Sequence, residues 1–281
     1  MATQVQPSPP VVGTGYQEIR IVSHSNLFYW WPVWAFGFAL CLLTLLDPNY
    51  MVLVPKGTHA EHNRVVQGMD NNKAVDVYVL PEGKSIDIDP QTGAPIQPHL
   101  HAAREKSYGV LYAIVLLLVI VITNVPLRGL WSVVVIVIIV LMSIIFQLAG
   151  WWDAILNALG LLRIHINAAG YLLISTALFI IWLMTFVLFD PQIYMIFTPG
   201  QLRVRQEIGG GEVVYDTAGM VIQKQRNDLF RHWVLGLGSG DLIVTTSGAA
   251  AHHFDLPNVL FVGYKVRQIE DMLREKPVVQ G

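Results

Sequence analysis

The sequence predicts an α-helical membrane protein with four transmembrane helices, an interfacial amphipathic helix, and a C-terminal small β-barrel or sandwich closed by one helix. The chain of 281 residues is 53% hydrophobic and only 14% charged, which is unlike a soluble protein. Four long stretches contain no Asp, Glu, Lys or Arg, and each is long enough to cross a bilayer. After residue 190 the pattern changes to short alternating segments separated by Gly and Pro turns.

The composition also excludes several classes of protein. Lys and Arg number 18 against 20 Asp and Glu, so the chain has no electrostatic footprint for nucleic acid. Cys41 is the single cysteine and can form no internal disulfide. The first twenty residues contain several prolines and one basic residue, unlike a cleavable signal peptide, and we assign residues 1–24 to an N-terminal tail.

The first span is predicted at residues 25–47. It begins in a cluster of aromatic residues that includes Trp30, Trp31 and Trp34. Because amphipathic rings favour the headgroup layer, we expect these three side chains to lie at the membrane interface.

The second and third spans are predicted at roughly Gly109–Val125 and Leu130–Leu148. Only four residues separate them, so we expect a tight helical hairpin with Arg128 at a membrane surface. The third span is followed by Trp151 and Trp152, which also indicate an interface.

Residues 151–166 are predicted as the interfacial helix. Apolar residues recur at helical spacing on the side opposite Asp153 and Asn157. A bent extension of the third helix is the alternative interpretation. The fourth span, roughly Tyr171–Phe189, completes the helical region 108–189 and stops at Asp190 and Pro191.

The spans contain no ionisable side chains of the kind that ion or proton pathways place at mid-membrane depth, which argues against transport by this chain alone. Basic residues near the span ends do not decide the orientation, because they are equally divided between the two sides. One side would hold Arg20, Arg128, Arg203 and Arg205, and the other Lys56, Arg104, Lys106 and Arg163.

Residues 48–107 form a long polar loop with short strands predicted at Tyr50–Val54, Val75–Leu80 and Ser85–Ile88. A loop of this length is expected to be functional or ordered by a partner. Its four histidines are candidate zinc or copper ligands if the two segments that carry them meet. These are His59, His62, His99 and His101. The alternative is surface histidines without metal, and on that interpretation no cofactor is expected.

Residues 190–276 are predicted as a separate domain, followed by a tail at 277–281. Six alternating segments indicate strands, and Val259–Glu275 has the apolar face of an amphipathic helix. The strands are expected at Gln192–Thr198, Gln201–Glu207, Glu212–Tyr215, Gly219–Lys224, Asp241–Thr246 and Ala251–Asp255.

Several strands followed by one helix is the order of a pleckstrin-homology (PH) fold. The segment Asp228–Val244, with Leu235-Gly236-Leu237-Gly238 at its centre, resembles the characteristic segment of bacterial PH-like membrane proteins. The Leu256-Pro257-Asn258-Val259 sequence and the predicted hairpin over 194–204 are similar to that family as well. The resemblance covers about residues 190–276. It implies a cytoplasmic module, both termini inside, and a location in the bacterial inner membrane.

Three basic residues, Lys224, Arg226 and Arg231, cluster near the segment before the last strands. A solvated rim is one interpretation, and contact with a lipid headgroup or a protein is the other. The glycines at 236, 238 and 240 precede a strand, so they indicate a turn and not a phosphate-binding loop. No Ser-His-Asp, Walker or kinase set is recognisable.

Three functions remain open. The first is a non-catalytic integral membrane protein with a PH-like module that acts as scaffold or accessory subunit of a larger membrane assembly. Its partners would be membrane lipids and other protein subunits, or further copies through self-association. The second is a metal-dependent membrane enzyme or metal sensor that uses the loop histidines. The third is recognition of lipid headgroups by the PH-like domain.

Overall fold

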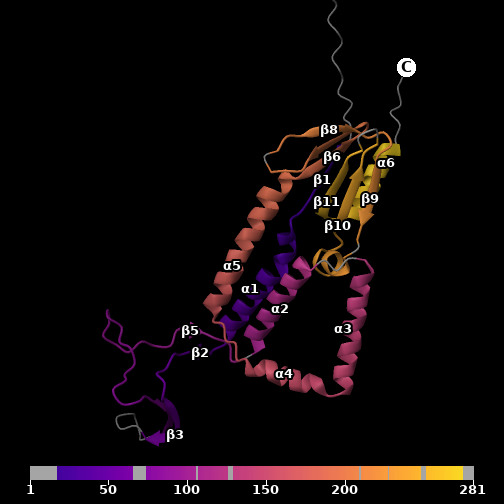
Figure 1. Ribbon diagram of the computed structural model, residues 1–281. Helices are drawn as coiled ribbons and strands as arrows, with labels where there is room; N and C mark the ends of the chain where they lie inside the picture. The colour runs from indigo at the N-terminus through magenta and orange to yellow at the C-terminus, as the bar shows by residue number, and fades with distance from the viewer. Residues whose placement is uncertain are drawn as a thin grey trace, which may run out of the picture.

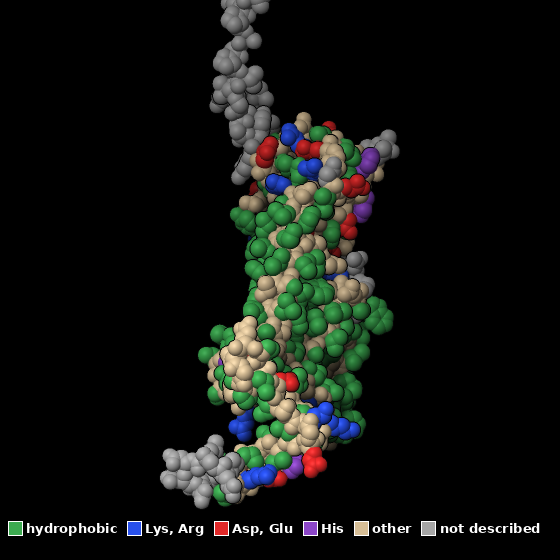
Figure 2. Space-filling model, turned by 90° about the vertical axis from the view of Figure 1, so that its left-hand side faces the viewer, with side chains coloured by type: hydrophobic (Ala, Val, Ile, Leu, Met, Phe, Trp, Pro, Cys, Tyr) green, Lys and Arg blue, Asp and Glu red, His purple; other side chains and the backbone are tan. Residues whose placement is uncertain are grey.

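The computed structural model describes residues 18–65, 74–105, 107–125, 129–208, 210–226, 228–247 and 251–274. The protein is elongated, with small sheets at one end, helices along the middle and the long loop at the other end (Figure 1). On the face drawn in Figure 2, hydrophobic side chains cover the middle of the molecule, while charged side chains gather toward its two ends. This distribution is the one expected of a protein that crosses a bilayer.

Among the described residues, four helices are long and apolar enough to span a membrane, as the sequence predicted. The first begins with a 3-10 turn, η1 (Asn26–Trp30), and continues as α1 (Trp31–Leu46). The second and third are α2 (Ser107–Asn124) and α3 (Leu130–Leu148). Arg128, between them, lies outside the described residues.

The fourth span runs further than the sequence indicated. Helix α5 (Ala168–Met184) continues through a π-helical turn, η3 (Thr185–Phe189), and a 3-10 turn, η4 (Asp190–Gln192). The predicted stop at Asp190 and Pro191 falls inside this last turn, because Pro191 occupies a first-turn position of η4, where no N–H is required.

Helices α1, α2 and α5 pack against one another around a shared apolar core. That core includes Val33 and Leu40 of α1, Tyr112 and Val119 of α2, and Tyr171 of α5. Helix α3 stands apart from these helices over most of its length (Figure 1). Within the described part of the chain, Ser132 is the single buried residue of α3.

Helix α4 (Trp151–Leu161) is a separate helix and not an extension of α3. Gly150 has a left-handed backbone, with φ of 68°, and this residue forms the corner between the two helices. Helix α4 then crosses back toward α2 and α5 (Figure 1). It ends five residues earlier than predicted, and Arg163, with φ of 47°, turns the chain soon after that end.

The C-terminal strands form two small antiparallel sheets. Strands β6 (Tyr194–Thr198), β7 (Gln201–Arg205) and β8 (Val213–Asp216) belong to the first sheet, and β9 (Val221–Gln225), β10 (Gly240–Thr245) and β11 (His253–Val259) to the second. The hydrogen-bonded order among the described strands is β1-β6-β7-β8 and β11-β10-β9, so a closed barrel is not formed there. Helix α6 (Val262–Arg274) contacts strands of both sheets. The two sheets and α6 contribute side chains to one hydrophobic core.

Strand β1 (Ile19–Val22) corrects the prediction that residues 1–24 are a tail. It pairs with β6 in antiparallel register, so that Ile21 lies opposite Met195, and both side chains are fully buried. Four residues of alternating pattern are too short to stand out in the sequence. The chain therefore enters the sheet region before its first membrane helix and returns to it after its last.

The described part of the long loop contains two separate two-stranded sheets. Strand β2 (Tyr50–Met51) pairs with β5 (Leu100–His101), and β3 (His59–Val65) pairs with β4 (Ala74–Val79). The strand predicted over 85–88 is not formed, because this segment makes a single bridge, between Ile88 and Pro95. The two ends of the loop are joined where Asp47 Oδ2 accepts the backbone N–H of Arg104 at 3.0 Å.

Helix α2 approaches the connection between α4 and α5 very closely at Gly109. A Cβ atom at this position would overlap the backbone carbonyl oxygen of Ile164, which cannot move as a side chain can. We expect Gly109→Ala to lower the free energy of unfolding by about 1–3 kcal/mol through overpacking. A lower Tm in detergent solution would show it.

Gly160→Ala is the matched control, because a Cβ there meets nothing within 4 Å. It should leave stability unchanged or raise it by up to about 1 kcal/mol, since Ala is the better helix former. Equal Tm values for the two variants would contradict the close contact at Gly109.

Candidate functional site

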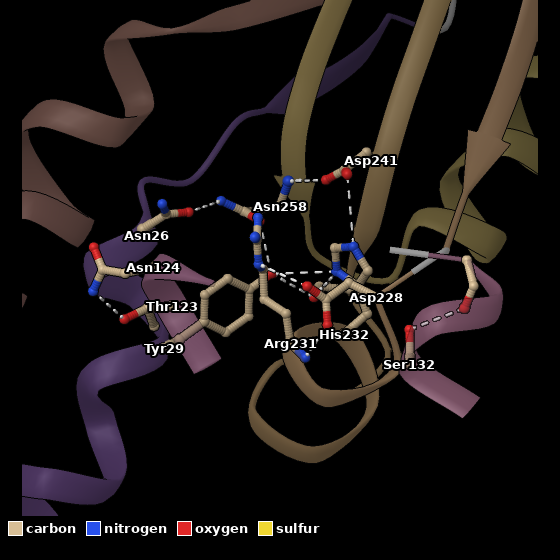
Figure 3. Close-up of polar contacts among 12 residues, drawn as sticks. Asn26, Tyr29, Thr123, Asn124, Ser132, Asp228, Arg231, His232, Asp241 and Asn258 are labelled. Atoms are coloured by element: carbon tan, nitrogen blue, oxygen red, sulfur yellow. Dashed lines mark hydrogen bonds and ion pairs between the residues drawn. The ribbon is translucent and has the colours of Figure 1, made fainter. Parts of the chain in front are cut away.

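A buried polar cluster lies where the first membrane helix meets the sheet domain (Figure 3). Its centre is Tyr29 of η1, surrounded by His232 of the π-helical turn η5 (Phe230–Leu235), by Ser239, and by Asn258 of β11. None of these four residues is more than 1% exposed. We call this set, together with Asp241, the junction network.

The Tyr29 hydroxyl connects the membrane helix to three residues of the domain. It donates to Asn258 Oδ1 at 2.8 Å, which can only accept. Its oxygen then remains free to accept a hydrogen bond, and Ser239 Oγ lies at 3.0 Å and His232 Nδ1 at 3.4 Å. Ser239 and His232 are also within 3.2 Å of each other. The hydroxyl group is thus surrounded by partners and separated from solvent.

Asp241, in β10, completes the network on the domain side. Its Oδ1 accepts the backbone N–H of Asn258 at 3.0 Å, and its Oδ2 lies 3.7 Å from His232 Nε2. Burial raises the pKa of the Asp241 carboxyl, but the contacts with His232 and the Asn258 N–H, with the positive charge of Arg231, outweigh burial and hold the pKa below its usual range. The side chain therefore lies in the network as a carboxylate.

A second chain of contacts extends the network to the end of the fourth span. Asn258 Nδ2 donates to the His24 carbonyl at 2.9 Å and to Asn26 Oδ1 at 3.2 Å. The buried imidazole of His24 lies with Nδ1 3.0 Å from Asp190 Oδ2, and Asp190 Oδ1 accepts the Ser25 N–H. The beginning of the first span, the end of the fourth span and the domain are thereby joined.

The sequence predicted one cluster of three basic residues, and the structure separates Arg231 from the other two. Arg231 is buried on the inner side of η5, where its Nε lies 3.5 Å from Asp228 Oδ2, so it is not available to a headgroup. Arg226 donates to the Gly238 carbonyl at 2.8 Å, and Lys224 is exposed on β9. The burial of Arg231 was not predicted, because a single helical turn places neighbouring residues on opposite sides.

Ser239, His232 and Asp241 are the side-chain types of a hydrolase triad, which the sequence did not reveal. Their arrangement differs from a catalytic one, because Ser239 is 0% exposed and its hydroxyl is engaged by Tyr29 and His232. A substrate cannot reach such a hydroxyl without unfolding the junction. The cluster therefore orients and fixes the domain.

Gly236 is necessary for this packing. A Cβ atom at this position would overlap Ser239 Oγ and would lie 2.7 Å from both the Arg231 carbonyl oxygen and the Tyr29 ring. The glycine run that the sequence indicated as a turn thus permits Tyr29 to approach the domain. The Gly236-Leu237-Gly238-Ser239-Gly240 sequence was the one local signal near the site.

The two pairs of loop histidines are not brought together. His59 and His62 lie in β3. His59 Nε2 is 3.0 Å from Glu61 Oε1, and His62 Nδ1 is 3.1 Å from Asp76 Oδ2. His101 lies in the other small sheet. His99 precedes β5, and its Nδ1 is 3.2 Å from the Gln97 carbonyl. Among residues that the structure describes, no group of three or more His, Cys, Asp or Glu side chains is placed to hold a metal ion.

The predicted interface tryptophans occupy both ends of the helical region. Trp31 donates through its indole N–H to the Leu235 carbonyl at 2.9 Å, and Trp152 donates to the Ser143 carbonyl at 3.1 Å. Trp34 instead packs between helices, with its ring 5.0 Å from that of Phe179. Trp30 is half-buried beside the helix core, and Trp151 is exposed.

Removal of the Tyr29 hydroxyl should destabilise the junction. Tyr29→Phe keeps the ring but leaves Asn258 Oδ1 without its donor in a buried site, which costs about 1–3 kcal/mol. We expect a lower Tm in detergent than for the unmodified chain. Tyr78→Phe, at a position that is 73% exposed, is the control and should have no effect. Equal stability of the two variants would contradict the role of Tyr29.

The Asp241 carboxylate should make stability depend on acid pH. Because its folded pKa lies below the usual 3.8, its contribution is present above the unfolded pKa and is lost as the pH falls through the folded pKa. Asp241→Asn should therefore be less stable than the unmodified chain at neutral pH, and the difference should shrink below about pH 4. Denaturant unfolding at a series of pH values measures this difference.

Asp87→Asn, which changes an exposed loop carboxylate, is the control for that series. It should follow the unmodified chain at every pH. A constant difference between Asp241→Asn and the unmodified chain down to pH 2 would contradict the assignment.

Comparisons with known proteins do not assign the chain to a family. A scan against protein-family models and searches of curated proteins and of solved structures find no match. The functional interpretation therefore depends on the contacts of the junction network and on the surfaces around it.

Proposed function

We propose that the chain is a non-catalytic integral membrane protein whose C-terminal module, PH-like by its sequence, acts as scaffold or accessory subunit of a larger membrane assembly. The observation that carries this proposal is the connection between the helices and the sheets. Strands β1 and β6, which pair along their length, belong to segments immediately before the first span and after the fourth. The junction network adds buried hydrogen bonds between Tyr29 and the domain.

Such a connection suits a domain whose task is to hold a surface at a fixed position relative to the bilayer. A soluble domain that was merely attached to the membrane would be joined to the helices by a flexible linker. Here only three residues separate β1 from η1, and one residue separates η4 from β6. Domains joined by extensive buried contacts do not move independently. The fixed geometry therefore supports a scaffold.

The helices favour the same function over transport. Helices α1, α2, α3 and α5 contain no Asp, Glu, Lys or Arg. An ion or proton pathway would normally require such groups despite their cost in the membrane. Helix α3 exposes apolar side chains on nearly all sides, which suits contact with lipid or with other helices.

The edge of the first sheet is where we expect a protein partner. Strand β8 is the last strand of its sheet, and its Val213 and Val214 are 50% and 54% exposed. An edge strand with apolar side chains can accept a strand from another chain. By the resemblance of the domain to bacterial PH-like proteins, we place this edge in the cytoplasm and the protein in the bacterial inner membrane.

Extraction in a mild detergent should give a defined complex larger than the monomer. The mass of the extracted particle, by light scattering corrected for detergent, measures this. A clean monomer under gentle conditions would contradict the scaffold proposal, because a scaffold must hold its partner.

Val214→Lys should reduce that complex to the monomer, since a charge at the partner edge opposes strand addition. Val65→Lys is the matched control, because Val65 is also 54% exposed but lies in β3, at the other end of the molecule. A complex that survives Val214→Lys and dissociates with Val65→Lys would place the partner on the loop.

A further inference from the structure

The turn that carries the junction network has an apolar outer side. Within η5, Arg231, His232 and Leu235 are buried, whereas Trp233 and Val234 are 65% and 61% exposed. Leu237, in the turn that follows, is 65% exposed. The turn thus buries two polar side chains, Arg231 and His232, and exposes three large apolar ones, whereas water-soluble domains usually bury such apolar side chains. We call Trp233, Val234 and Leu237 the apolar tip.

The apolar tip lies at the depth of the membrane helix ends. Leu235, between its members, packs with Phe28, Tyr29 and Ile122, which belong to the first span and to the last turn of α2. The Leu235 carbonyl accepts the indole N–H of Trp31, in the first turn of α1. In Figure 1 the turn is the golden coil below β10, beside the upper ends of α2 and α3.

A basic side chain lies beside the tip, and a second basic residue and an exposed tyrosine lie near it. Arg226, bound to the Gly238 carbonyl, also lies with Nη2 3.5 Å from the point where a Cβ of Gly263 would stand, and Lys224 Nζ is 3.8 Å from the same point. Next to Gly263 along the chain, Tyr264 is 66% exposed. Apolar groups bordered by aromatic rings and cations are typical of the layer between lipid tails and headgroups.

We propose that Trp233, Val234 and Leu237 insert into the lipid interface on the domain side of the bilayer, with Lys224 and Arg226 at the level of the headgroup phosphates. Lipid is the occupant because the tip is held at the ends of the membrane helices, where Leu235, between its members, packs in one buried cluster with Phe28 and Ile122. The insertion rests on the membrane location of the helices and is independent of any protein partner.

Spin-label accessibility in proteoliposomes tests the insertion. Val234→Cys carries the reporter, in a chain whose native thiol is removed by Cys41→Ala. Val221→Cys is the matched control, because Val221 is also exposed, at 51%. It lies at the end of β9 away from Lys224 and Arg226, where it pairs with Thr245. A nitroxide is attached to each, and collisions with oxygen, which concentrates in lipid, and with a water-soluble nickel chelate are compared.

The label at 234 should collide mainly with oxygen and little with the nickel chelate, while the label at 221 shows the opposite preference. Trp233→Cys serves as a second reporter at the tip and should behave like Val234→Cys. Nickel accessibility at 234 equal to that at 221 would overturn the insertion. Shielding of the tip labels from both agents would overturn it as well, because that result indicates contact with protein. If the tip is inserted but the extracted protein is a monomer, the scaffold proposal is refuted and the insertion is not.

Discussion

The Tyr29 hydroxyl is the contact on which the arrangement of this protein depends. It comes from the first turn of a membrane-spanning segment and makes its hydrogen bonds with residues 203 to 229 positions further along the chain. In a buried site, a lost partner leaves the remaining polar groups unsatisfied, and the cost falls on the whole cluster. The helices and the sheet domain can therefore separate only if several buried groups lose their partners together.

The surroundings of Tyr29 follow from this constraint. Gly236 has no side chain because the Tyr29 ring and Ser239 occupy that space, and Asn258 adopts a left-handed backbone, with φ of 57°, while its side chain reaches both Tyr29 and Asn26. The inner side of η5 holds Arg231, His232 and Leu235, so Trp233 and Val234 are left on the outer side, which we place toward the membrane. One set of contacts thus supports both the fixed position of the domain and the inserted tip that we propose.

The sequence predicted the parts of the fold that depend on local pattern. Four apolar stretches free of charge predicted the membrane helices. The change in apolar spacing after α3 predicted α4, and the structure places the left-handed Gly150 at that point. Strand β1 was missed because four residues carry too little periodicity, and its partner is more than 170 residues away. The junction network was missed because its members are far apart in the sequence: Tyr29 looks like one of several interface aromatics until the fold brings it against Ser239 and Asn258.

A double-mutant cycle between Tyr29 and Ser239 tests the central claim most directly. Tyr29→Phe, Ser239→Ala and the double variant are unfolded by denaturant in detergent, and the three losses of stability are compared. Because the two hydroxyl oxygens lie 3.0 Å apart in a buried site, we predict a coupling free energy of about 0.5–3 kcal/mol. Losses that add within about 0.3 kcal/mol would show that the two groups act independently, and would contradict the junction network as the connection between membrane helices and domain.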